Sequence, residues 1–263
     1  MSDETEFRLD GFIPEPDSPK HWSYEDLLKS RMVGQVTGDV DLRKYSSPRH
    51  NQRKSSSCVA NAVVKALEIK RIMAGGGHDA HLDLSIMAVY YLAREIMMPP
   101  KTHVDGGTYV SHACDVLRRF GVCPSVDWPF DLSKVNISPS WAAMRKAYVR
   151  RIESFYKIRS TDDDRVAECI RCLQAGNPVV FGTTVGSNWG RYKKGQVLKA
   201  PSSVTGRHAT VLVGYKDGNF IGENSWGAGW GSDGFYLMDP DVVAYAQSSD
   251  FWVIQTGLED LAT

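Results

Sequence analysis

The spacing of apolar residues divides the chain into a first part with helical patterns and a second part with short apolar runs. After Cys58, apolar side chains recur about once per helical turn, which predicts a helix that ends at the glycines of residues 75–77. The first part is therefore expected to be mainly helical. Its other helical patterns cover residues 23–32, 84–97, 108–122 and 140–149.

The second part predicts a mainly antiparallel β structure. Its strongest signal, residues 208–226, contains two apolar runs joined by Asp217-Gly218, a dipeptide typical of a tight hairpin turn. The two parts together indicate an α+β fold, with a helical lobe at about residues 55–150 and a β lobe at about 151–257. The other elements expected here are a helix at 164–176 and strands at 178–185, 234–238 and 251–257.

Composition places the chain among ordinary globular proteins. It has 263 residues, 42% hydrophobic and 24% charged, which is enough for a substantial core. Basic and acidic residues both number 31, so the charge balance gives no reason to expect nucleic acid or an anionic membrane as partner. No apolar run approaches the roughly 20 residues of a membrane span, and no basic and apolar leader is visible. We expect a monomer in the cytoplasm, or one exported without an N-terminal leader.

The five cysteines are an odd number in a chain too long to need disulfide bonds, so we expect mostly reduced thiols. Cys169 and Cys172 form a C-x-x-C pair within a helical pattern, without a second pair at zinc-ligand spacing. Core packing is the expected role of these two, and no metal site is predicted.

Cys58 stands where a serine-rich loop becomes a helix. The free N–H groups and the dipole at a helix start favour a thiolate, which is the form a nucleophilic cysteine needs. Position alone is weak evidence, since a structural cysteine is the commoner interpretation. His208, at the start of one hairpin strand, and Asn224, at the end of the next, would lie side by side. An asparagine there fixes the imidazole tautomer, as the aspartate does in a serine triad.

The order of these motifs resembles the papain family of cysteine peptidases. Gln52 precedes Cys58 by six residues, "HATVLVGY" begins at His208, and "NSWGAGWGSDGF" begins at Asn224. The resemblance covers about residues 39–238. It implies a papain-like peptidase domain at 39–263, with a helical left lobe, an antiparallel β-barrel-like right lobe, and the active site in a cleft between them.

The resemblance also implies a mechanism and a set of substrate contacts. Cys58 and His208 would form a thiolate–imidazolium pair, and Gln52 with the backbone N–H of Cys58 would hold the oxyanion. Trp226 would shield the Asn224–His208 bond from water. The remaining assignments are a peptide-binding cleft wall at Gly106 and Gly107 and a pocket contact at Arg207. The expected activity is that of a cysteine endopeptidase acting on protein or peptide substrates without a cofactor.

Three positions depart from the family pattern. Ser55 replaces a cysteine that is usually in a disulfide, Ser56 replaces a glycine, and Val59 replaces a tryptophan that lines the cleft. None of these changes removes a reacting group, but the lost tryptophan leaves substrate preference open.

Residues 1–38 are shorter than the helical propeptides typical of the family's lysosomal members. The proline-rich stretch "FIPEPDSP" is expected to be extended. It would either cross the cleft as an inhibitory strap or pack elsewhere as a structural extension.

Two other functions remain compatible with the motifs. An acyl transferase or transpeptidase would use the same Cys-His-Asn site and pass the acyl group to an amine. A catalytically silent homologue would only hold a peptide in the cleft.

Overall fold

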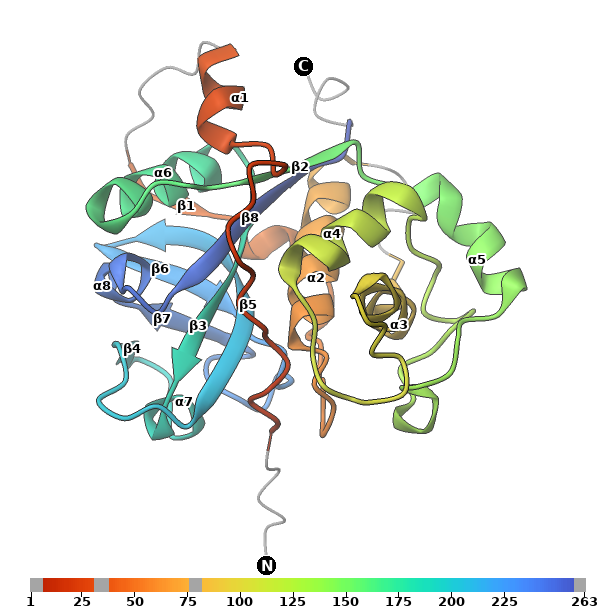
Figure 1. Ribbon diagram of the computed structural model, residues 1–263. Coiled ribbons are helices and arrows are strands. Elements are labelled where there is room, and N and C mark those ends of the chain that lie inside the picture. The colour runs from red at the N-terminus through yellow and green to blue at the C-terminus, as the bar shows by residue number, and fades with distance from the viewer. Residues whose placement is uncertain (1–6, 31–37, 76–81, 258–263) are drawn as a thin grey trace, which may run out of the picture.

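The computed structural model describes residues 7–30, 38–75 and 82–257, which form two adjacent lobes (Figure 1). The helical lobe, on the right in Figure 1, is built around a central helix that begins at the predicted nucleophile. Its elements are α2 (Cys58–Met73), α3 (Ile86–Ile96), α4 (Val110–Arg119), η3 (Leu132–Lys134), α5 (Trp141–Ala147) and η4 (Tyr148–Arg150).

The second lobe is an open sheet of eight strands in the order β2-β8-β3-β5-β6-β7-β4, with β1 paired to β5. The α+β prediction is confirmed; the barrel-like sheet does not close, because β2 and β4 remain at opposite ends of this order. The strands are β1 (Val40–Asp41), β2 (Ser154–Lys157), β3 (Val179–Val185), β4 (Val197–Leu198), β5 (Gly206–Lys216), β6 (Asn219–Glu223), β7 (Phe235–Met238) and β8 (Ser249–Gln255). The remaining elements are α1 (Tyr24–Ser30), η1 (Arg43–Tyr45), α6 (Asp162–Gln174), α7 (Ser187–Gly190) and α8 (Pro240–Ala244).

The hairpin β5–β6 is the element that the sequence predicts most directly. Asp217 and Gly218 both have positive φ, of 50° and 77°, as a two-residue turn of this type requires. Strand β5 also pairs with β3 over its first half, with His208 opposite Thr183. Pairing with β3 at His208 itself, and with β6 from Val211 onward, holds His208 on a rigid element. The short elements β2, β4, α7 and α8 were not predicted, because they are too short to carry a clear periodicity.

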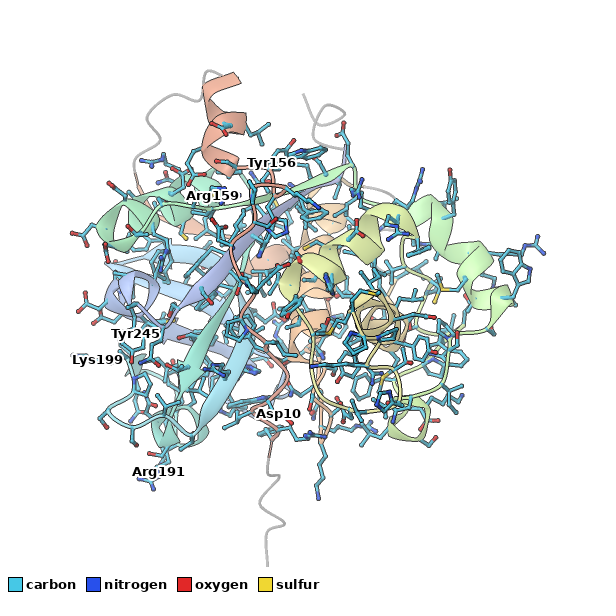
Figure 2. The ribbon with its side chains drawn as sticks, viewed as in Figure 1. Asp10, Tyr156, Arg159, Arg191, Lys199 and Tyr245 are labelled. Atoms are coloured by element: carbon cyan, nitrogen blue, oxygen red, sulfur yellow. The ribbon has the colours of Figure 1, made fainter. Side chains whose placement is uncertain are left out.

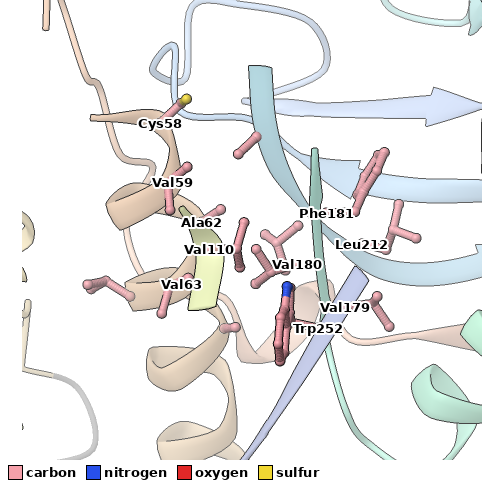
Figure 3. Packing of buried hydrophobic residues seen from close by; sticks show 14 of the residues in the cluster. Cys58, Val59, Ala62, Val63, Val110, Val179, Val180, Phe181, Leu212 and Trp252 are labelled. Carbon is pink, nitrogen blue, oxygen red and sulfur yellow. The ribbon is translucent and has the colours of Figure 1, made fainter. Parts of the chain in front are cut away.

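Helix α2 lies between the two lobes and is buried along nearly its whole length. Figure 3 shows Ala62 of this helix, Val110 of α4 and Val180 of β3 in the core between the helix and the sheet. The loop before α2 holds serines, but the hydroxyl of the N-cap residue Ser57 makes no capping bond. It is bonded by Ser55 Oγ and Asn61 Nδ2 instead. The Ser57 hydroxyl is thus used within the nucleophile turn and does not cap the helix.

The N-terminal segment crosses the front of the molecule between the two lobes (Figure 1, red). Residues 7–17, called the strap, contact the helical lobe through Thr108 and the sheet lobe through Arg207. After the strap, α1 begins and Tyr24 is buried in the core. Among the described residues, no helix is long and apolar enough to span a membrane.

Candidate active site

Cys58 is the first residue of α2 and is fully buried. Burial raises the pKa of its thiol to about 12, against a smaller lowering effect of the backbone N–H groups of Ala209 and Val59. The sequence predicted the opposite shift from the helix start. Desolvation by burial outweighs the backbone hydrogen bonds and favours the protonated thiol in this closed state.

His208 and Asn224 are paired as predicted. Nε2 of His208 lies 2.8 Å from Oδ1 of Asn224 and both side chains are buried. The other ring nitrogen, Nδ1, has no hydrogen-bond partner among the described residues, so no bond joins it to Cys58. Burial lowers the imidazole pKa to about 4, although the bond to Asn224 acts in the other direction. Burial thus disfavours the charged forms of both Cys58 and His208 in this closed state, and the thiolate–imidazolium pair remains a prediction for the open enzyme.

Aromatic side chains surround the imidazole. The ring of Trp226 lies 4.9 Å from that of His208, between centroids, and Trp189 approaches the same imidazole edge-on at 5.8 Å. Trp226 covers the pair as expected. Trp189 was missed, because it comes from the four-residue helix α7 and its sequence context "SNWG" carries no recognisable signal.

Gln52 is buried beside the nucleophile turn. Its Oε1 accepts a bond from Ser225 Oγ at 2.6 Å, which fixes the orientation of the amide. Its Nε2 donates to Ser55 O at 3.0 Å and points to Arg8 O at 3.4 Å. The predicted oxyanion donor is thus directed at a carbonyl oxygen of the strap.

The strap fills the space between the lobes directly over the thiol. A Cβ placed on Gly11 would come within 2.7 Å of Cys58 Sγ and would also overlap Ser56 O. On the facing wall, a Cβ on Gly206 would overlap Leu9, whose carbonyl accepts a bond from Arg207 N at 2.6 Å. The space that the strap occupies is called the cleft here. It passes Cys58.

The paired glycines form the helical wall of the cleft, but they do not bind the strap as expected. Thr108 pairs with it instead, donating to Gly11 O at 3.2 Å and accepting from Ile13 N at 3.3 Å. The N–H of Gly107 is occupied by the hydroxyl of Tyr90 at 3.1 Å. A Cβ on Gly107, whose φ is 78°, would lie 2.5 Å from Gly11 O. The strap backbone can therefore come close to this wall only because residue 107 is a glycine. Gly106 has no such contact with the strap.

Arg207 contributes its backbone to the strap, and its side chain is exposed. A pocket contact of that side chain with substrate remains a prediction. Ser55 and Ser56 occupy the places where the family pattern has a disulfide cysteine and a glycine. Ser56 Oγ donates to Asp10 of the strap at 2.6 Å, and its backbone N–H donates to Asp105 at 2.9 Å.

All five cysteines are free thiols and all are buried. Cys169 and Cys172 lie in the core on α6, as expected for packing residues. Within residues 7–30, 38–75 and 82–257, no group of three or more potential ligands is arranged to hold a metal ion.

Comparisons with known proteins agree with this geometry. Residues 36–250 match the model of the papain family cysteine proteases. An uncharacterized peptidase C1-like protein of Acanthamoeba polyphaga mimivirus is 30% identical over 238 residues, covering 84% of this chain and 75% of the relative. Macrodontain-1 of Ananas macrodontes is 25% identical over 217 residues, covering 79% of this chain and 91% of its own.

The crystal structure of xylellain, a cysteine protease from Xylella fastidiosa, has the same fold with a TM-score of 0.78. It is 26% identical in sequence, and the superposition covers 94% of this chain and 95% of xylellain.

Proposed function

The chain belongs to the papain family of cysteine proteases and is a thiol peptidase, and from this premise we propose that it is an endopeptidase kept latent by its own strap. The observation that carries the proposal is the course of residues 7–13. They pass over Cys58 as an extended peptide, bonded to Thr108 on one wall and Arg207 on the other. A cleft that accepts a chain continuing on both sides of the nucleophile is suited to internal peptide bonds.

In the open enzyme, His208 Nδ1 takes the thiol proton and Cys58 Sγ attacks the carbonyl carbon of the substrate. The N–H of Cys58 and Nε2 of Gln52 donate to the oxyanion. His208 returns the proton to the leaving amine, the C–N bond breaks and a thioester remains. Water, deprotonated by His208, then attacks the thioester, and the acid product leaves Cys58 as a thiolate. Asn224 holds the imidazole in position throughout.

The strap opposes each part of this mechanism. It excludes water, which keeps the thiol and the imidazole neutral. It directs a carbonyl toward the amide of Gln52. It also presents to Sγ the side of Gly11 on which a Cβ would stand, and thereby fills the space in front of the nucleophile.

The test uses Gly11→Ala in the full chain, because the added methyl group overlaps Ser56 and Cys58 and should displace the strap. We expect this variant to cleave an unstructured peptide faster than the wild type, and the double variant Gly11→Ala/Cys58→Ala to be inactive. A folded Gly11→Ala protein without activity would contradict the proposal. Gly190→Ala is the matched control, since a Cβ there meets nothing within 4 Å.

Product masses separate the alternatives. Hydrolysis yields a new carboxylic acid, whereas an acyl transferase would join the acyl fragment to an added amine. A silent peptide-binding homologue would leave the peptide intact in every variant.

A further inference from the structure

Asp105 stands on the helical wall of the cleft, directly before the paired glycines. Its side chain is 18% exposed beneath the strap. Oδ1 accepts bonds from the backbone N–H of Ser56 at 2.9 Å and the hydroxyl of Tyr90 at 2.6 Å. These two donors fix the carboxylate in one orientation beside the nucleophile turn.

The second oxygen of this carboxylate faces the strap. Oδ2 lies 3.1 Å from Nη1 of Arg8. The nearby buried cation, Arg94, donates hydrogen bonds to the carbonyls of Val104 and Val135, and within the described residues it forms no ion pair with Asp105. When the strap leaves, Arg8 leaves with it, and Oδ2 is left as an anchored anionic acceptor that opens into the cleft.

Arg8 also lies beside the predicted oxyanion donor. Its carbonyl oxygen is the strap acceptor of Gln52 Nε2, at 3.4 Å. In a substrate, the carbonyl held by Gln52 belongs to the residue whose peptide bond is cut. Arg8 thus contacts Gln52 through its carbonyl oxygen and Asp105 through its guanidinium group.

Arg8 has a second partner within the strap, Asp10, which also accepts a bond from Ser56 Oγ. Figure 2 labels Asp10 on the strap, where this segment runs between the lobes. Asp10 would leave together with Arg8, whereas Asp105 stays on the helical wall as a partner for a basic side chain.

We propose that Asp105 is a specificity-determining residue, which directs cleavage to peptide bonds that follow an arginine or lysine. This inference rests on the proposed endopeptidase function and adds its substrate class. The planar guanidinium of arginine suits a fixed carboxylate oxygen better than the ammonium of lysine, so arginine is the preferred residue.

The test compares two fluorogenic peptides that differ only in arginine or its neutral isostere citrulline before the scissile bond. Full-length Gly11→Ala opens the cleft, and Phe12→Ala, which removes another strap anchor, provides a second background. We expect kcat/KM to be about 10- to 100-fold higher for arginine, the range of one hydrogen bond to a charged group. Adding Asp105→Asn keeps an acceptor for Ser56 and Tyr90 but should bring the arginine-to-citrulline ratio close to one.

Asp115→Asn is the matched control, because Asp115 pairs with Arg118 and Arg119 on the surface of α4. It should leave the ratio unchanged. Equal cleavage of both peptides, or an arginine preference that survives Asp105→Asn, would overturn this inference and leave the endopeptidase proposal standing. No cleavage of either peptide in both folded backgrounds would overturn the two together.

Discussion

The ring of Phe12 lies directly against the backbone of Gly182, so closely that a Cβ on Gly182 would overlap the ring atoms. Phe12 is only 2% exposed and belongs to the hydrophobic core, although it comes from the N-terminal segment. Gly182 of strand β3, which has no side chain, thus leaves the space that the ring of Phe12 fills. The strap is held by burial of this ring as well as by its backbone bonds.

Phe12→Ala should therefore weaken docking of the strap. Truncating a buried phenylalanine typically costs about 3–5 kcal/mol, which here falls mainly on the docked segment. Hydrogen exchange of the amides at residues 9–13 should accelerate while the core strand β5 stays protected. Phe120→Ala, at a ring that is 37% exposed, is the control. Unchanged exchange in the strap would show that its anchorage lies elsewhere.

Gln52→Glu tests the oxyanion donor without removing the bond from Ser225. The carboxylate can still accept from Ser225 Oγ, but it has no N–H for the oxyanion. In the Gly11→Ala background, kcat should fall about 10²–10³-fold, as for other oxyanion donors. A loss below about threefold would mean that Gln52 is not directed at the reacting oxygen.

The low pKa of His208 predicts a specific dependence of stability on pH. The imidazole titrates at about 4 in the closed protein and near 6.5 when free, so between these values only the unfolded or opened state binds the proton. The contribution of His208 to the free energy of unfolding is complete above pH 6.5 and is lost as the pH falls towards 4. It amounts to about 3 kcal/mol. Acid therefore favours opening of the strap as well as unfolding.

Denaturant unfolding at pH 7 and pH 4.5 measures this effect. His208→Gln, which cannot titrate, should lose less free energy of unfolding than the wild type over the same interval. Equal losses in the two proteins would place the pH dependence on other groups.

The catalytic residues could be predicted because each lies in a local pattern. Cys58 begins a clear helix, and the hairpin turn at Asp217-Gly218 sets His208 and Asn224 on neighbouring strands. The closed geometry could not be predicted in this way. Whether residues 7–17 fill the cleft depends on contacts with Thr108, Gly182 and Arg207, which are far away in the sequence.

The same limit explains why the direction of the Cys58 pKa shift and the partners of the serine hydroxyls could not be predicted. A helix start lowers a thiol pKa when water reaches the site, but the strap removes the water from Cys58. The serine hydroxyls of the preceding loop found side-chain partners that no local pattern indicates. Asp105 lacked a signal for the same reason, since its partners Ser56, Tyr90 and Arg8 come from three separate segments.

In the proposed mechanism, the strap alone keeps Cys58 from reacting, since the other catalytic residues are already in place. Mass spectrometry of the intact protein after incubation with the epoxide inhibitor E-64 tests it most directly, in the wild type, Gly11→Ala, Gly190→Ala and Cys58→Ala. We expect one adduct at Cys58, formed at least about tenfold faster in Gly11→Ala, since each 1.4 kcal/mol of strain in the docked strap raises the open fraction tenfold. Gly190→Ala should match the wild type, and Cys58→Ala should remain unlabelled. Equal labelling rates in the wild type and Gly11→Ala, or no adduct in a folded Gly11→Ala protein, would contradict the account.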